Sequence, residues 1–250
     1  KRQLWGFPRF LATLSTMTRR LPPLRRTRRR LNLARIAARF SEGVAKVEAT
    51  IEPFAQWWDA HNHRALHDDG PLWVALGDSV TQGIGASEPA RSYPATVLET
   101  VRSDSGAPWR LINLSMSGAR FDDVIQRQLD VLAEFELQPT VVSAVIGSND
   151  VIWRRNSDAI IDDARRLVDA LPDGTILSRV SEARRDRRRI GVNHVFDAAA
   201  ATGRVKLYEA WDWPTGEGMW AEDRFHPNDR AHGHLAENLL QAFRHHRIVS

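Results

Sequence analysis

From Pro71 onward, the sequence alternates short apolar runs with segments of helical periodicity. The apolar runs predict strands at residues 72–76, 111–114, 140–146, 175–177 and 205–208. Helical patterns lie between and after them, at residues 90–103, 121–135, 160–171, in an alanine-rich stretch before Gly203, and at 235–243. Alternating strands and helices predict an α/β fold, in which a parallel sheet has helices on both faces. Its crossover connections should be right-handed.

Polar or glycine-containing loops follow four of these strands. Ser79 follows the first strand, Gly118 the second and Asn149 the third, while Asp223 and His226 come after the fifth. Because the carboxyl ends of parallel strands emerge at one edge of a sheet, we expect these residues to meet there. Four separate loops converging on one point carry more weight than any one of the motifs alone.

These residue types suit acyl transfer. A serine hydroxyl is a weak nucleophile that needs an adjacent base, and His226 can take its proton. Asp223, three positions earlier, can hold the imidazole in the correct tautomer. Gly118 and Asn149 can donate to a tetrahedral oxyanion. Each residue alone also fits a structural role, as a turn former or a helix cap, but the combination favours catalysis.

The motifs resemble those of the SGNH, or GDSL, hydrolases. The matching residues are Gly-Asp-Ser at 77–79, Gly118 in its Ser-Gly context, Gly-x-Asn-Asp at 147–150 and Asp-x-x-His at 223–226, and the resemblance covers about residues 70–245. It implies a flavodoxin-like three-layer α/β/α sandwich with a five-stranded parallel sheet. It also implies Ser79 as nucleophile, His226 as base, Asp223 as its orienter, and no metal or organic cofactor. The implied oxyanion hole consists of the N–H groups of Ser79 and Gly118 and the side chain of Asn149.

The expected function is that of a serine hydrolase of the esterase or lipase type. It would cleave carboxylic esters of short-chain or acetyl groups, or lipid esters, through an acyl-enzyme. Four tryptophans near the motifs are candidates for substrate binding, with ordinary packing as the alternative: Trp153, Trp211, Trp213 and Trp220. A competing hypothesis is a basic membrane- or nucleic-acid-binding protein with a vestigial hydrolase site.

That competing hypothesis comes from the uneven charge of the chain. Residues 1–40 carry twelve lysines and arginines and no acid, whereas the whole chain has a net charge of +4, so residues 41–250 carry −8. The basic segment predicts attraction to an anionic surface, and we favour a membrane over nucleic acid. Packing against the acidic body, or linkage to upstream sequence, are the alternatives. No apolar run is long enough to span a bilayer. Residues 1–9 resemble a signal peptide only weakly, because Pro8 and Arg9 interrupt the apolar run, so we expect a cytoplasmic or peripherally membrane-associated protein rather than a secreted one.

The predicted organisation has three parts. Residues 1–45 form a basic arginine-rich arm, residues 46–69 a lead-in helix, and residues 70–250 the hydrolase domain. Apolar residues at helical spacing predict one helix around residues 33–47 and a second over residues 51–66.

For two further groups of residues we favour a structural role over a role in binding. His63 and His67 are four positions apart, but no carboxylate completes a metal-binding spacing, so we expect a solvated helix face. The arginine-rich run at 179–189 is expected to be solvated rather than to bind an anionic substrate. The chain has no cysteine, which excludes disulfides and thiolate chemistry.

Overall fold

The computed structural model describes residues 20–25, 41–153, 156–182, 186–212 and 218–249. Its sheet consists of β1 (Leu72–Gly77), β2 (Arg110–Asn113), β3 (Val141–Val145), β4 (Thr175–Ser178) and β5 (Val205–Tyr208). The strands are all parallel and lie in the order β2-β1-β3-β4-β5. This is the flavodoxin-like order, in which the direction of winding reverses between β1 and β3. The predicted fold class is therefore confirmed.

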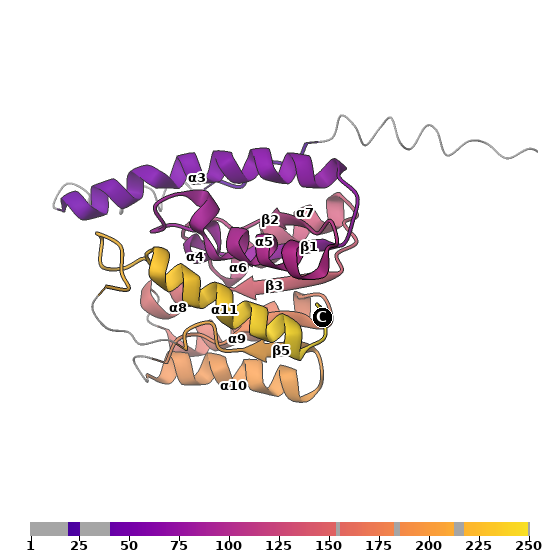
Figure 1. The fold of residues 1–250 in the computed structure, drawn as a ribbon. Helices are drawn as coiled ribbons and strands as arrows, with labels where there is room; N and C mark the ends of the chain where they lie inside the picture. Colours follow the sequence, from indigo (N-terminus) through magenta and orange to yellow (C-terminus); the bar gives the residue numbers. More distant parts are fainter. Residues whose placement is uncertain (1–19, 26–40, 154–155, 183–185, 213–217, 250) are drawn as a thin grey trace, which may run out of the picture.

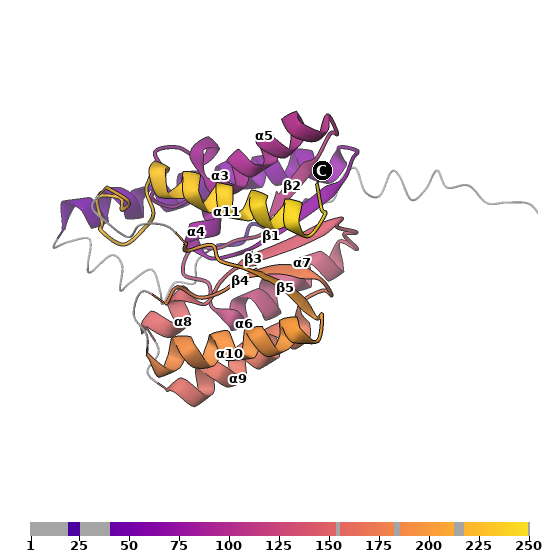
Figure 2. The ribbon, with the colours of Figure 1, turned by 60° about the horizontal axis from the view of Figure 1, so that its bottom comes forward.

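Helices cover both faces of this sheet, as Figures 1 and 2 show. One layer contains α5 (Tyr93–Ser105) and α11 (Asp229–His245). The opposite layer contains α6 (Phe121–Asp123), the π-helical turn η2 (Val124–Gln128), α7 (Leu129–Glu134), α9 (Ser157–Ala170) and α10 (Arg187–Ala201). Three short helices lie in the loops: α4 (Ser79–Gln82), η1 (Pro89–Arg91) and α8 (Ser148–Trp153).

The pleat of β1 divides the core between the two layers. Leu72, Val74 and Leu76 point into the cluster under α9 and α10, whereas Trp73 and Ala75 point into the cluster under α5 and α11. All six residues of β1 are buried. Side chains alternate between faces along a strand, so a central strand of a three-layer fold must be apolar throughout. This is why the run at 72–76 is almost continuously apolar.

One long helix, α3 (Glu42–His67), precedes the sheet and runs along the edge at β2. Ser41 caps it through a bond from Val44 N–H. We predicted a break between two helices around residues 47–51, and that prediction is wrong. Gly43 and Pro53 both lie inside α3, which continues through them because Phe54, Ala55 and Trp58 are buried against the body. Tertiary packing here outweighs poor helix formers.

Helix α3 begins within the segment that we assigned to the arm, residues 1–45, because residues 42–45 are helical. The division of the chain into arm, lead-in helix and hydrolase domain stays a prediction. Residues 1–19 and 26–40 lie outside the described residues, so the role of the basic arm stays a prediction. Within the ranges that the structure describes, no helix is long and apolar enough to cross a membrane.

Candidate active site

Ser79 lies at the carboxyl end of β1, at the point where the sheet reverses its winding. The sharp turn out of β1 is capped by Asp78, whose Oδ1 accepts from the N–H of Val80 at 3.0 Å. Helix α4 then ends at Gly83 in the left-handed region. The capping role weighed for this stretch is therefore real, but Asp78 performs it. The hydroxyl of Ser79 is left for a different contact.

That contact is with His226. The Nε2 atom of His226 lies 3.0 Å from Ser79 Oγ, and its Nδ1 atom lies 2.6 Å from Oδ2 of Asp223. The other carboxylate oxygen of Asp223 accepts from the backbone N–H groups of Phe225 and His226, at 3.0 Å each. Arg224, between Asp223 and Phe225, has a φ of 54°, in the left-handed region. The D-x-x-H spacing thus folds into one compact hydrogen-bonded loop.

The charge state of Asp223 follows from these bonds. Burial raises its pKa, but the hydrogen bond and charge of the His226 ring, together with the two backbone N–H donors, outweigh burial and leave the pKa below its ordinary value. Asp223 is therefore an anion at neutral pH. An anion bonded to Nδ1 keeps the proton on that nitrogen and leaves Nε2 free to accept one from Ser79.

Asn149 joins three of the loops. It lies in the first turn of α8, and its side-chain Nδ2 donates to the carbonyl of Ala119 at 3.0 Å and to Asp78 Oδ2 at 3.3 Å. Gly118, immediately before Ala119, has a φ of 78°, a conformation that favours glycine. The residues predicted for the oxyanion hole therefore come from the ends of β1, β2 and β3, which meet at this edge.

Asp78 is an unusual neighbour for a nucleophile. It is buried, and burial raises its pKa to about 7, helped by the nearby charge of Asp150, while the N–H of Val80 acts in the opposite direction. A carboxyl group with a raised pKa in a water-poor site often marks a functional centre. Sequence reasoning considered Asp78 as part of a motif and as a helix cap, but not as a buried carboxyl group, because its burial depends on residues distant in the chain.

A cavity of about 430 Å³ opens beside Ser79 and His226. Three of the predicted tryptophans line it, namely Trp153, Trp211 and Trp220, while Trp213 lies outside the described residues. The described part of the chain has three exposed large hydrophobic residues, and all of them line this cavity: Trp153 (63% exposed), Phe225 (40%) and Ile152 (38%). The rings of Trp153 and Phe225 are 6.3 Å apart.

Residues 75–234 match the sequence pattern of the GDSL-like Lipase/Acylhydrolase family, which is more than half of the chain.

The chain belongs to this family.

It is therefore an ester-hydrolysing serine enzyme, and a binding protein with a vestigial site is not favoured. No curated protein matches the sequence.

Solved structures agree with this GDSL-like fold. TesA is 21% identical, with a TM-score of 0.58, and the similarity covers 69% of this chain and 98% of TesA. The esterase EstA from Pseudoalteromonas sp. is 17% identical, with a TM-score of 0.59 and coverage of 70% and 98%. Axe2, an acetylxylan esterase from Geobacillus stearothermophilus, is 23% identical, with a TM-score of 0.52 and coverage of 70% and 94%. At these identities the likeness shows the fold.

The arginine-rich run of this GDSL-like chain is only partly solvated, contrary to our expectation. Arg187, 77% exposed, fits that expectation. Arg189 lines the active-site cavity with an 11% exposed side chain and pairs with Asp186 at 2.6 Å. Arg179 pairs with Asp197 and Glu209. Helix α10 begins inside the run, so its first turn faces the site, and no charge count along the sequence reveals that. Residues 183–185 lie outside the described residues.

Three residues that line the cavity were not expected from the sequence. Sequence reasoning did not select Ile152, Arg224 or Phe225 for the cavity, although all three lie directly beside the motifs.

The rings of His63 and His67, on α3, contact each other edge to face, with centroids 5.0 Å apart. Across the described ranges, no group of three or more His, Asp or Glu residues is placed to hold a metal ion.

Proposed function

We propose that Ser79, His226 and Asp223 form the catalytic triad of this ester hydrolase. Ser79 Oγ attacks the ester carbonyl carbon while its proton passes to His226 Nε2, and the carbonyl electron pair moves to oxygen. The tetrahedral intermediate collapses, the C–O bond to the alcohol breaks, and the departing alcohol takes the proton from His226. Water then attacks the acyl-enzyme by the same steps and releases the carboxylic acid. The 3.0 Å and 2.6 Å contacts of His226 carry this proposal.

The developing oxyanion needs fixed donors, which we assign to the N–H groups of Ser79 and Gly118 and to the side chain of Asn149. In the free site both hydrogens of the Asn149 amide are already directed at acceptors, Ala119 O and Asp78 Oδ2. The bond to Asp78 is the longer of the two, so it is the one that the oxyanion replaces. Because burial raises the pKa of Asp78 to about 7, part of the Asp78 population is protonated near neutral pH, and a protonated carboxyl group is a weaker acceptor of this hydrogen than a carboxylate.

The cavity favours esters with an apolar acyl group. Its rim consists of Ile152, Trp153 and Phe225, and its wall includes Trp211 and Trp220. A volume of about 430 Å³ exceeds what an acetyl group needs. Arg189 and Arg224 add two guanidinium groups to an otherwise largely apolar lining. We therefore propose that the substrate is a small-molecule or lipid ester whose acyl chain is longer than acetyl.

Replacement of the nucleophile tests the proposal directly. Ser79→Ala should lower turnover of nitrophenyl esters by at least about three decades, because only the oxyanion donors and substrate binding remain. Labelling with an active-site-directed phosphonate, followed by peptide mass spectrometry, should add one adduct, on Ser79. A Ser148→Ala control removes a second hydroxyl that lines the cavity and should retain turnover. Activity above a tenth of wild type in Ser79→Ala would exclude the assignment.

The basic arm supports a second, separate proposal, binding to an anionic membrane surface. Residues 1–40 carry the charge for it. In the described part of that segment, however, Arg25 pairs with Glu52 and Asp59 of α3, so at least this arginine packs against the acidic body. Binding of the full chain to anionic vesicles should weaken as salt is added and disappear when residues 1–40 are deleted. Salt-independent binding, or none, would contradict the proposal.

A further inference from the structure

Helix α3 lies outside residues 75–234, which match the family. Nearly all of TesA is covered by 69% of this chain, so about a third of the chain has no counterpart there. Yet α3 contacts loops that hold the proposed triad. We propose that α3 positions the loop of Asp223 and His226 against Ser79, and that its first turn, through Gly43 and Lys46, is the part that sets this position. This inference rests on the proposed roles of those three residues.

The first turn of α3 is in direct contact with Glu222, the residue before Asp223. A Cβ atom at position 43 would lie 2.7 Å from the carbonyl carbon of Glu222 and closer still to its oxygen. Glycine therefore allows the helix to touch the loop backbone itself. Three residues further along α3, Lys46 Nζ lies 2.9 Å from a carboxylate oxygen of Glu222. The helix thus fixes both the backbone and the side chain of the residue that leads into the triad.

A small apolar cluster continues this contact towards His226. Val47, Phe54, Ile84 and Ala86 are buried together, with Ile51 of α3 and Ala221 of the loop packed against them. Gly85, between two of its members, approaches the catalytic loop so closely that a Cβ atom there would lie 2.8 Å from Cβ of His226. The loop near His226 therefore packs on the segment 84–86, and α3 packs against the same segment.

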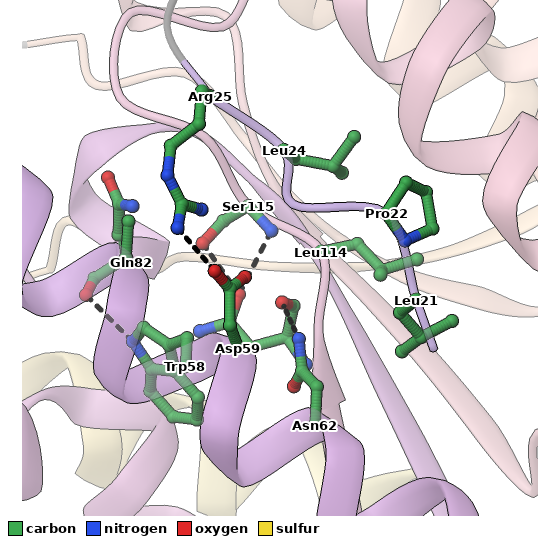
Figure 3. A pocket seen from close by; sticks show the side chains of 12 residues that line it. Leu21, Pro22, Leu24, Arg25, Trp58, Asp59, Asn62, Gln82, Leu114 and Ser115 are labelled. Carbon is green, nitrogen blue, oxygen red and sulfur yellow. Dashed lines mark hydrogen bonds and ion pairs between the residues drawn. The ribbon is translucent and has the colours of Figure 1, made fainter. Parts of the chain in front are cut away.

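The middle of α3 holds the Ser79 side of the same site. Figure 3 shows Trp58 directed at Gln82, the last residue of α4, and the bond from Trp58 Nε1 to Gln82 O is 2.9 Å long. The side chain of Gln82 in turn accepts from the N–H and hydroxyl of Ser117, beside Gly118. The hollow between α3 and residues 21–25 is only about 20 Å³, room for about one water molecule, so this region is a packed joint rather than a second site.

One rigid element thus contacts the loops on both sides of the 3.0 Å contact between Ser79 and His226. A catalytic group displaced by about 1 Å can cost about a hundredfold in rate, and loops hold such groups less firmly than helices do. The close contact at Gly43 gives a way to move the loop without changing any residue of the triad. That makes Gly43 a positioning residue that can be tested by itself.

Gly43→Ala is the decisive variant, with Gly233→Ala as its matched control. Both change a helical glycine to alanine, but a Cβ atom at position 233 meets nothing within 4 Å. Alanine is the better helix former, so neither change should lower the melting temperature through helix propensity. We expect Gly43→Ala to lower kcat about tenfold or more with KM within about twofold, and to slow phosphonate labelling of Ser79 in parallel. Gly233→Ala should match wild type in both.

Wild-type kcat and labelling in Gly43→Ala would overturn the inference. If Ser79→Ala were also active, the proposed triad would fail instead, so the two failures are distinguishable. If Gly43→Ala does not fold, reversing the charges of the Lys46–Glu222 ion pair tests the inference instead. Lys46→Glu and Glu222→Lys should each lower kcat, and the double variant should restore it. Single variants with wild-type kcat, or a double variant with no recovery, would overturn the inference too.

Discussion

Asn62 pairs its side-chain amide with both backbone groups of Asn113. Its Nδ2 donates to Asn113 O, and its Oδ1 accepts from Asn113 N–H, each at 2.8 Å. The amide therefore occupies the place that a sixth strand would take beside β2. Edge strands present unpaired backbone groups that invite pairing with other chains. In this protein α3 covers the edge and satisfies two of those groups.

This pairing predicts a loss of stability in Asn62→Ala. Removing the amide leaves a buried N–H and a buried carbonyl without partners, which should lower the free energy of unfolding by about 1–3 kcal/mol. Urea denaturation with an unchanged m-value would measure it. Asn238→Ala is the control, because Asn238 donates only longer bonds of 3.3 and 3.4 Å, one of them exposed. Equal losses in the two variants would contradict the interpretation.

Asn149→Ala should affect the reaction more than the binding of substrate. If its amide stabilises the oxyanion, kcat should fall by about two to three decades while KM changes little. Steady-state kinetics on a nitrophenyl ester would show this split. Ser148→Ala, one residue earlier in the same turn, is the control for disturbance of α8. A drop in kcat of less than about fivefold would remove Asn149 from the oxyanion hole.

Asp78→Asn should change how stability depends on pH. Because burial raises the pKa of Asp78 to about 7 from an ordinary value of 3.8, the folded protein keeps this proton at pH values where the unfolded chain has released it. Wild type should therefore lose stability as pH rises from about 4 to 7. Asparagine does not titrate, so its stability relative to wild type should increase over that window.

Melting temperatures of both proteins at pH 4.5, 6 and 8 would measure this effect. Asparagine keeps a side-chain oxygen that can accept from Val80 N–H, so the cap should survive. Asp122→Asn, at an exposed residue paired with Arg166, serves as a control for removing one carboxylate. A constant difference between Asp78→Asn and wild type at all three pH values would contradict the raised pKa.

Trp153→Ala should alter the preference for acyl length. The ring lines the cavity and is 63% exposed, so we expect it to cover the far end of a long acyl chain and to add little to the binding of an acetyl group. We therefore expect kcat/KM to fall about threefold to tenfold for octanoyl esters and to change little for acetyl esters. An ester panel of increasing chain length, run on wild type and Trp153→Ala, would measure the profile, with the acetyl ester as the internal reference. An equal loss on all chain lengths would contradict acyl binding at Trp153.

Much of the site was predictable from the sequence because its parts are local. Ser79, Asn149 and the Asp-x-x-His segment each follow a strand whose apolar pattern is legible, and parallel strands bring such segments to one edge. The parallel sheet has this arrangement, and Ser79, Asp223 and His226 lie within hydrogen-bonding distance of one another along it, while their roles as a triad stay a proposal. Chemistry encoded within a few consecutive residues can be read before the chain is folded.

Other features of the site depend on contacts between residues that are distant in the sequence, and only the tertiary structure determines them. The burial that raises the pKa of Asp78, the inward position of Arg189 and the exposed rim of Trp153 and Phe225 have no signature in the local sequence. The contact of Gly43 with Glu222 joins residues far apart in the chain. From the sequence, a glycine in a helix indicates only a poor helix former, and its role in close packing becomes visible once the backbone against it is known. Burial and close approach are properties of the folded whole, so only the fold could assign them.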